Sequence, residues 1–409
     1  MKIAIIGAGV SGMSFAKLCM RDKLADVVIF EAQKFHGGLA RVEDVNGYPY
    51  HLTGGHCFNS KYPEVLDFVF NDVLSKDNWN LIERKADIMF EGHSIPYPIE
   101  FSLKQIAEFN PILATNIVKD FIEAQQKNLP SMNLKEWFVN NFGYSLATEY
   151  LIPYNTKIWG RDISSMSPNW VSDKLPMPNV NSFILGLLKS GSDNMPHNNF
   201  YYPKSGTQQQ FLDALREGLD IRFNSKIEGI KKDNSGKYVI ENEIFDKVIY
   251  TGPLDNSCYV FDIANLKDAC SKLEFNVVTT MLWEREACEE TWTYLPDSTC
   301  TYHRLIHIGN FLLPKQNISI AEAVGERSYD EMVIAGSKIP SLSKPIGYHV
   351  SNHAYVVFDD NRDNSVNVIT RILKENDVHC LGRFGEWEYY NMDICIKSAM
   401  TLAEEIKVI

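Results

Sequence analysis

Apolar residues at the start of the sequence fall into two short runs separated by a segment with helical spacing. Residues 3–6 form the first run, residues 11–20 repeat apolar positions with the period of a helix, and residues 27–30 form the second run. A strand, a turn, a helix and a second strand within this length make up a βαβ unit. The pattern therefore predicts two parallel strands joined by a helix.

The middle of the sequence has helical spacing and lacks β-branched runs. Its three helical segments are residues 103–123, 134–141 and 180–190. Strand-like segments return at residues 226–250, around a hairpin turn predicted at residues 233–236. Further short β-like runs lie at residues 277–283, 305–313 and 355–358, and an amphipathic helix is predicted at residues 392–406.

A glycine-rich segment joins the first predicted strand to the first helix. Gly7, Gly9 and Gly12 follow the pattern G-x-G-x-x-G. The first glycine permits a tight turn, the second lets a pyrophosphate approach the backbone, and the third lets helix and strand pack closely. Glu31 lies 19 residues after Gly12, where its carboxylate can accept hydrogen bonds from ribose hydroxyls. Strand, helix, glycines and acid together predict a dinucleotide site.

Composition narrows the class of protein. The chain is 45% hydrophobic and 22% charged, as in an ordinary globular protein, and its net charge of −12 disfavours nucleic acid as a partner. No stretch approaches ~20 uninterrupted apolar residues, so we expect no integral membrane segment. The eight cysteines include no C-x-x-C pair, which gives no signal for a metal site. We expect a cytoplasmic protein with reduced thiols.

A second pair of glycines indicates which dinucleotide is bound. Gly37 and Gly38 follow Glu31 after five residues, and Arg41 lies three residues further on. This spacing resembles the E-x-x-x-x-x-G-G signature of the amine oxidase and sugar mutase flavoproteins, in which the second glycine turn reaches the cofactor's phosphates. The resemblance implies FAD as the cofactor, with Gly38 and Arg41 beside it.

Five blocks in the rest of the chain resemble those of the UDP-galactopyranose mutase family. They are Gly54-Gly55-His56, Pro96-Tyr97-Pro98, residues 153–160, residues 250–255 and residues 382–389. Each block is modest alone, whereas five blocks in the same order, spread over nearly the whole chain, are specific.

The resemblance implies which residues contact the cofactor. Gly55 and His56 would lie beside the isoalloxazine ring, with His56 near the flavin N5 as a catalytic residue. Gly252 belongs to the block at the end of a strand, and Gly382 and Arg383 belong to the block that closes over the flavin.

The resemblance also implies a substrate site. Trp159 would stack on the uracil or form a wall beside the sugar, with Tyr154 in the same block, and Tyr389 would bond a substrate phosphate. Arg304 lies where the family places an arginine against the nucleotide pyrophosphate, and it is the second residue assigned to catalysis. A guanidinium suits this role because it binds phosphate oxygens bidentately.

Three residues depart from the family pattern, all in the substrate half of the site. Lys174 stands where bacterial relatives carry an arginine for the diphosphate, Asn391 where they carry an aspartate, and Asn59 where they carry a second histidine. Lys174 and Asn391 stay candidates for substrate binding. The flavin half of the site is intact, so the sequence points to FAD without naming the sugar.

The implied activity is that of an isomerase that interconverts the pyranose and furanose forms of a nucleoside-diphosphate sugar, UDP-galactose or a related one. Reduced FAD would attack the anomeric carbon through N5 and expel the nucleoside diphosphate, and the ring would reclose through a different hydroxyl. NAD(P)H or another reductant would reduce the FAD. The sequence is compatible with either a monomer or a homo-oligomer.

Two alternatives share the dinucleotide fingerprint. An amine oxidase or porphyrinogen-oxidase-like flavoenzyme is the first, and Trp159 and Arg304 argue against it because a neutral amine or porphyrin needs no arginine for a diphosphate. A non-enzymatic flavin- or NAD-binding regulator is the second, and the replacements at Lys174 and Asn391 keep it open.

The element pattern predicts an α/β fold of several domains, which suits a chain of 409 residues. We expect a discontinuous Rossmann-type FAD-binding domain (1–86, 200–262 and 378–409), an inserted helical domain (100–199) and an antiparallel sheet domain that holds the substrate (87–99 and 263–377).

Overall fold

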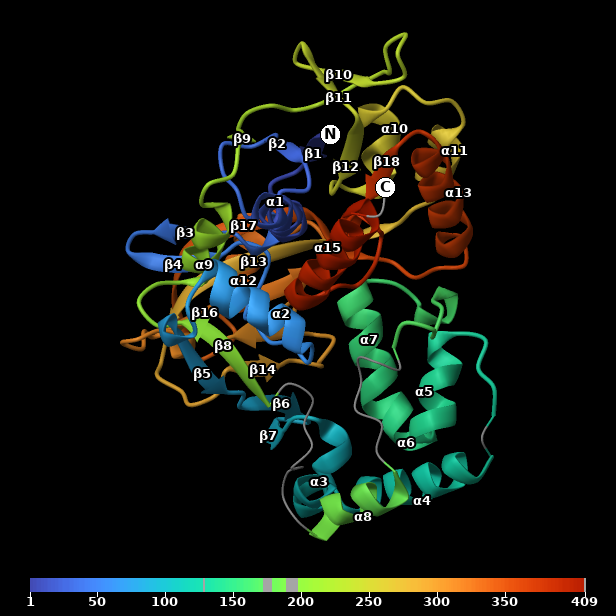
Figure 1. Cartoon of the computed structure of the whole chain (residues 1–409). Coiled ribbons are helices and arrows are strands. Elements are labelled where there is room, and N and C mark those ends of the chain that lie inside the picture. Colours follow the sequence, from blue (N-terminus) through green and yellow to red (C-terminus); the bar gives the residue numbers. More distant parts are fainter. Residues whose placement is uncertain (128, 172–178, 189–197, 408–409) are drawn as a thin grey trace.

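A five-stranded parallel sheet forms the upper part of the molecule in Figure 1, which shows the computed structural model. The structure describes residues 1–127, 129–171, 179–188 and 198–407. The strand order is β18-β12-β1-β2-β9, and every neighbouring pair is parallel. The strands are β1 (Lys2–Ile6), β2 (Asp26–Phe30), β9 (Ile221–Arg222), β12 (Lys247–Tyr250) and β18 (Val378–Cys380).

Helices and loops cover both faces of this sheet. Ile3, Ala4 and Ile5 are each 0% exposed, and successive residues of a strand point to opposite faces, so neither face meets water. On one face, α1 (Val10–Asp22) packs against α15 (Met392–Lys407) and both share an apolar cluster with β1.

A group of helices lies at the lower right of Figure 1. They are α3 (Leu103–Phe109), α4 (Pro111–Lys127), α5 (Leu134–Phe142), α6 (Tyr144–Leu146), α7 (Ile152–Trp159) and α8 (Val180–Leu188). The prediction of a single helix over residues 103–123 is wrong, because the first helix ends before Asn110 and a second helix begins at Pro111. A proline disfavours the helical conformation of the residue before it and fits the first turn of the next helix.

A seven-stranded sheet runs through the left and centre of Figure 1. Its order is β17 (Leu342–Val356), β13 (Phe275–Arg285), β16 (Ile318–Val324), β15 (Arg304–Ile306), β14 (Trp292–Tyr294), β6 (Ala86–Phe90) and β7 (His93–Pro96). The pairing is antiparallel except between β14 and β6, which are parallel. The strand predicted at residues 305–313 ends at Ile306, and a turn of 3₁₀ helix follows at Ile308–Phe311.

Shorter elements complete the fold. They are β3 (Val42–Val45), β4 (Tyr48–His51), α2 (Pro63–Asp67), β5 (Trp79–Glu83), β8 (Asn199–Pro203), α9 (Gln208–Arg216), β10 (Tyr238–Ile240), β11 (Glu243–Phe245), α10 (Ser257–Val260), α11 (Leu266–Cys270), α12 (Tyr329–Gly336), α13 (Arg362–Glu375) and α14 (Gly382–Gly385). The turn predicted at residues 233–236 is present, since the Gly236 N–H donates to the Asp233 carbonyl over 3.0 Å.

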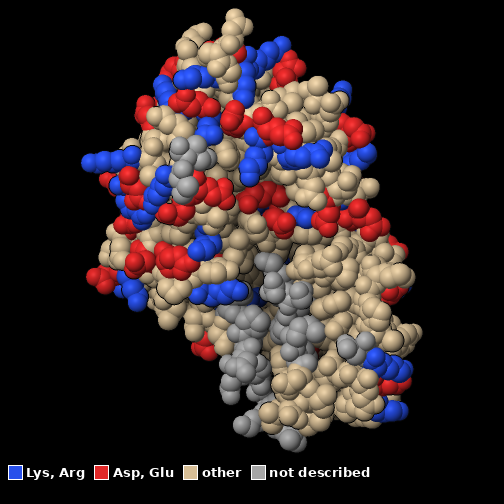
Figure 2. Space-filling model, turned by 45° about the vertical axis from the view of Figure 1, so that its right-hand side comes forward, with Lys and Arg blue, Asp and Glu red and all other residues tan. Residues whose placement is uncertain are grey.

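The arrangement confirms the predicted fold class, a discontinuous Rossmann-type domain with a helical part and a largely antiparallel sheet. On the face in Figure 2, basic and acidic side chains are interspersed. Within the described ranges, no helix has the length and apolarity needed to cross a bilayer.

Candidate functional site

One cavity of about 1150 Å³ lies where the parallel sheet meets the seven-stranded sheet. Its wall begins at the carboxyl ends of β1, β2 and β12, the edge at which open α/β sheets bind ligands. It continues to β14, β15 and β17. Pockets for one small ligand measure about 300–1,000 Å³, so this cavity has room for a dinucleotide and part of a second molecule.

Gly7, Gly9 and Gly12 form a backbone cradle at one end of the cavity. Gly7 has φ +112°, which glycine adopts without strain. A Cβ on Gly9 would meet no atom within 4 Å and would project into open space, whereas a Cβ on Gly12 would lie 2.3 Å from the Gly7 carbonyl oxygen. The geometry matches a turn that phosphates can approach and a helix that packs closely on its strand.

Glu31 lies beside this cradle at the end of β2. Its two carboxylate oxygens accept hydrogen bonds from the Ala8 N–H (2.8 Å) and the Gln33 N–H (2.9 Å). Each carboxylate oxygen has a second lone pair, so Glu31 can still accept a ribose hydroxyl.

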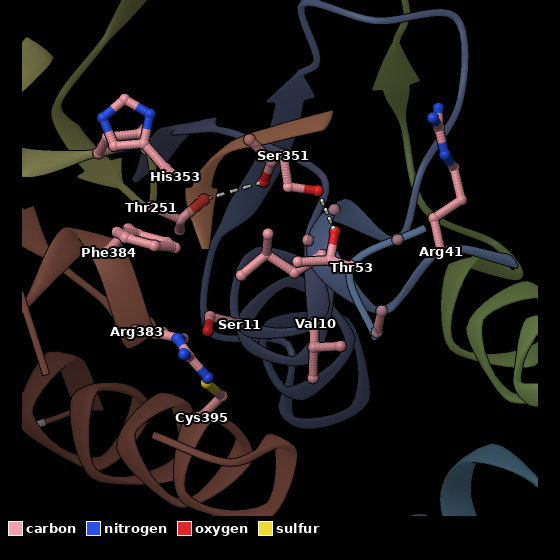
Figure 3. A pocket seen from close by; sticks show the side chains of 18 of the residues that line it. Val10, Ser11, Arg41, Thr53, Thr251, Ser351, His353, Arg383, Phe384 and Cys395 are labelled. Carbon is pink, nitrogen blue, oxygen red and sulfur yellow. Dashed lines mark hydrogen bonds between the residues drawn. The ribbon is translucent and has the colours of Figure 1, made fainter. Parts of the chain in front are cut away.

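The second glycine turn contacts the first. The Gly37 N–H donates to the Ala8 carbonyl over 2.8 Å, and a Cβ on Gly38 would lie 3.2 Å from the Gly9 Cα. Arg41 lies apart from Arg383 (Figure 3). Its guanidinium lies 4.8 Å from the Phe35 ring and forms an ion pair with Glu43 at 3.0 Å. The two turns therefore form one phosphate-sized backbone surface.

The Gly54-Gly55-His56 loop lies directly against the seven-stranded sheet. Gly54 has φ +89°, and a Cβ there would lie 2.6 Å from Glu322 Oε2. A Cβ on Gly55 would lie 2.4 Å from Ile306 Cγ2. Thr53 before the loop bonds Ser351 of β17 over 2.8 Å (Figure 3). Only glycines allow the loop to approach the sheet this closely.

His51 holds the position of His56. The His56 backbone N–H donates to His51 Nδ1 over 3.2 Å, so a neutral His51 carries its proton on Nε2 and donates it to Tyr202 Oη over 2.9 Å. His51 is 0% exposed, and burial lowers its pKa well below 6.5. The motif analysis missed this residue, although it lies five positions before His56.

His56 presents an unsatisfied ring nitrogen to the site. Its Nε2 is buried and has no partner in the part of the chain that the structure describes. Burial, followed by the positive charge of Arg383, lowers the pKa of His56 to about 4, and Arg304 acts in the same direction. His56 is therefore neutral at pH 7, with a nitrogen that a ligand could satisfy.

Arg304 is paired with a buried carboxylate. Its Nη2 donates to both oxygens of Glu322 over 2.8 Å and to Tyr355 Oη over 2.8 Å. His303 Nε2 approaches Glu322 at 3.2 Å. Burial opposes the ionisation of Glu322, but Arg304 and His303 outweigh it and hold its pKa at about 2. Arg304 lines the cavity with its charge already balanced by Glu322.

Arg383 lies between two tyrosine rings at the start of α14. Its guanidinium is 4.8 Å from the Tyr355 ring and 4.7 Å from the Tyr389 ring. It donates to the carbonyls of Ala354 (2.8 Å) and Tyr390 (3.3 Å), and its Nε is buried without a partner. Within the described chain no carboxylate pairs with it, so Arg383 brings net positive charge to the cavity beside Cys395 (Figure 3).

The structure brings most of the predicted site residues to this cavity. Those that line it are Gly7, Gly9, Glu31, Gly38, Arg41, Gly55, His56, Gly252, Arg304, Arg383 and Asn391. Gly382 packs behind it, where a Cβ would lie 2.0 Å from Ser11 Oγ. Lys174 lies outside the described residues.

The predicted aromatic residues lie behind the wall of the cavity. Tyr154 and Trp159 of α7 are 9% and 4% exposed, and neither lines the cavity. Trp159 packs edge-on against Trp170 at 5.0 Å, and its Nε1 has no partner. Tyr389 stacks on Tyr355 at 5.5 Å. Arg84 and Tyr294 also line the cavity, although neither belongs to one of the sequence motifs.

Comparison with known proteins supports the same assignment of fold. Residues 5–71 match the family described as NAD(P)-binding Rossmann-like domain. The UDP-galactopyranose mutase of Mycoplasma pneumoniae is 20% identical over 98% of this chain and 95% of its own. The dTDP-fucopyranose mutase of Escherichia coli is 21% identical over 98% of this chain and 97% of its own.

A crystal structure of reduced UDP-galactopyranose mutase superposes with a TM-score of 0.86, at 20% identity, over 99% of this chain and 93% of that one. At this identity the superposition establishes the fold. The chain thus resembles UDP-galactopyranose mutases over its full length, in sequence and in fold, as its five motif blocks predicted.

Proposed function

We propose that this protein is a flavin-dependent mutase that interconverts the pyranose and furanose forms of a nucleoside-diphosphate sugar. The observation that carries the proposal is one continuous cavity that is lined both by the glycine turns of the dinucleotide cradle and by Arg84 and Arg304. Full-length similarity to mutases of UDP-galactopyranose and dTDP-fucopyranose supports the substrate class.

The residues of the cradle fit FAD. Gly9 leaves open space where the pyrophosphate would approach, and Glu31 keeps lone pairs for the ribose hydroxyls. His56 Nε2 and Arg383 Nε are buried polar atoms without a partner among the described residues, and both side chains line the cavity. When bound in its reduced form, the flavin would supply the nucleophile for the anomeric carbon.

The side chains around the cavity would prepare the substrate for this chemistry. Neutral His56 can share a hydrogen bond through Nε2 without adding a charge beside the cofactor. Arg383 would stabilise negative charge, because no carboxylate of the described residues pairs with it. A bound substrate would displace water from these side chains, which would strengthen each of these interactions and hold the reacting groups in place.

The activity test uses the purified protein with UDP-galactopyranose and, separately, dTDP-fucopyranose. Under anaerobic conditions the dithionite-reduced protein should form furanose without consuming a stoichiometric reductant, as measured by chromatography, and the oxidised protein should form none. Peroxide produced in proportion to product would instead assign the protein to the oxidase class. Absence of turnover and of nucleotide-sugar binding would favour a regulator.

The cofactor test is independent of turnover. The purified protein should release FAD rather than FMN on denaturation. Gly9→Val should lose FAD while keeping its circular dichroism spectrum, because the new side chain would occupy the open space above the turn. Normal FAD content in Gly9→Val would show that the phosphates lie elsewhere.

A further inference from the structure

Arg84 is an arginine of the cavity wall, and no acidic group among the described residues balances its charge. It lies between β5 and β6, and it lines the same cavity as the dinucleotide cradle. Its Nη2 donates to Tyr294 Oη over 2.6 Å, while its Nε is buried and has no partner among the described residues. Across the described ranges of the chain, no carboxylate forms an ion pair with it. A cation that is held away from water without an anion indicates an anionic ligand.

Two aromatic rings hold the guanidinium of Arg84. Its Cζ lies 5.3 Å from the centre of the Tyr97 ring and 5.0 Å from the Trp292 ring. The Tyr97 ring also lies 4.9 Å from the Tyr294 ring. Guanidinium groups stack on aromatic faces and keep their N–H edges available for hydrogen bonds, which an ammonium group cannot do in the same way. Arg84 is therefore preorganised for a planar or bidentate acceptor.

The strand register places this arginine on the same wall as Arg304. Tyr294, which binds Arg84, pairs directly with Arg304 across β14 and β15. Side chains of directly paired residues lie on the same face of a sheet, about 4.5–5.5 Å apart at Cβ. Arg84 and Arg304 thus both lie beside Tyr294, and all three line the cavity.

The charges of the two arginines differ in their effect. Arg304 forms three hydrogen bonds with the fully buried Glu322, so this pair contributes little net charge. Arg84 contributes a full positive charge, because its polar neighbour is a neutral phenol. The sequence assigned the substrate's diphosphate chiefly to Arg304, whereas the observed pairing favours Arg84 as the stronger attraction for an anion.

We propose that Arg84, held by Tyr97, Trp292 and Tyr294, is the principal protein contact for a phosphate of the nucleoside-diphosphate moiety. This inference rests on the proposed function for the identity of the ligand. Arg304 then acts beside it as a charge-balanced hydrogen-bond donor, and its position is fixed by Glu322.

The test is a titration of FAD-loaded protein with UDP and with uridine, followed by tryptophan fluorescence and calorimetry. Arg84→Met should weaken UDP binding by about 10- to 100-fold, as expected for a lost charge-assisted phosphate contact. Uridine binding and FAD content should stay unchanged. Lys85→Met is the matched control, because it removes the same charge from the adjacent, exposed residue that does not line the cavity.

Arg84→Lys keeps the positive charge and serves as a second variant in case Arg84→Met impairs folding. It should bind UDP with intermediate affinity, because a lysine lacks the planar fork. UDP affinity equal to wild type in both Arg84 variants would overturn the inference and leave the proposed function standing. Failure of wild type to bind any nucleoside diphosphate would count against the proposed function itself. A slower reduction by NADPH with unchanged UDP affinity would assign the phosphate to the reductant instead and overturn the assignment to the substrate.

Discussion

Replacing Glu322 by glutamine tests the most deeply buried ion pair of the site. The side chain is 0% exposed and keeps nearly the same shape as an amide, so the change removes a charge without opening a cavity. Arg304 would lose its carboxylate partner, and His303 would lose the anion that its Nε2 approaches. The chain should still fold, with a lower free energy of unfolding.

The size of this loss follows from the pKa of Glu322. A fall from 4.5 to about 2 on folding corresponds, at about 1.4 kcal/mol per pH unit, to about 3 kcal/mol at pH 7. Breaking a buried pair costs about 3–5 kcal/mol in general. We expect the lower end of this range, because the Arg304 side chain is 23% exposed and water in the cavity can hydrate it.

The sign of the pH dependence is fixed. The pKa of Glu322 is lower in the folded state, so its stabilisation is present above pH 4.5 and is lost as the pH falls towards about 2. The difference in unfolding free energy between wild type and Glu322→Gln should therefore shrink over that interval. Urea unfolding monitored by tryptophan fluorescence between pH 7 and pH 3 measures it.

Glu289→Gln serves as the control, since the Glu289 side chain is 76% exposed and its ion pairs with Lys85 and Lys315 lie at 3.9 and 4.0 Å. Its unfolding free energy should change by less than about 1 kcal/mol. A second consequence concerns binding: UDP should stabilise Glu322→Gln more than wild type, because the ligand's phosphates would then balance Arg304. A stability difference that does not vary with pH would refute the reasoning.

Three further changes test the loop that carries His56. Gly54→Ala should lower the free energy of unfolding by more than about 2 kcal/mol, because its Cβ would lie 2.6 Å from Glu322 Oε2. Gly47→Ala is the control: Gly47 has a similar φ (+84°) but no atom within 4 Å of a Cβ, so this change should cost only about 1 kcal/mol. Equal losses for the two variants in urea unfolding would contradict this. The pKa of His56 falls from 6.5 in the unfolded chain to about 4 in the fold. The unfolded chain therefore binds a proton more readily, and the free energy of unfolding decreases as the pH falls from 6.5 towards about 4. The His56 ring should therefore show no NMR titration between pH 6 and pH 8, and a midpoint near 6.5 would mean that water reaches the ring. His51→Phe removes the acceptor of the His56 N–H, so hydrogen exchange in residues 52–58 should accelerate at least tenfold; unchanged exchange would exclude His51 as the support of the loop.

The shape of the glycine cradle could be predicted from local sequence. Gly7, Gly9 and Gly12 each serve one backbone requirement, and these requirements lie within a single strand–turn–helix unit. Glu31 follows at the end of the next strand of the same unit. Such patterns are readable because neighbours in sequence are also neighbours in space.

The second half of the site depends on contacts between distant segments, which a single sequence does not reveal. Glu322 meets Arg304 only because β15 pairs with β16 in one register, and a shift of one residue would send Glu322 to the other face. Arg84 meets Trp292 through the parallel pairing of β14 and β6, two segments about 200 residues apart. The break at Pro111, in contrast, was available to a local rule.

The order of strands in the parallel sheet has a consequence for biosynthesis. β1 lies between β2 and β12, and β18 pairs with β12 at one edge of the sheet. The helix α15 packs on α1, which covers one face of the sheet. β1 begins at Lys2, whereas β18 begins at Val378 and α15 at Met392. The native contacts of β1 with its sheet and of α1 with α15 therefore cannot be complete until the chain has been synthesised through these elements. Native pairing across such separations is slow and leaves apolar strands exposed meanwhile. Binding of the dinucleotide should therefore wait until β18 and α15 have been synthesised, and nascent chains that end before residue 378 should hold no dinucleotide.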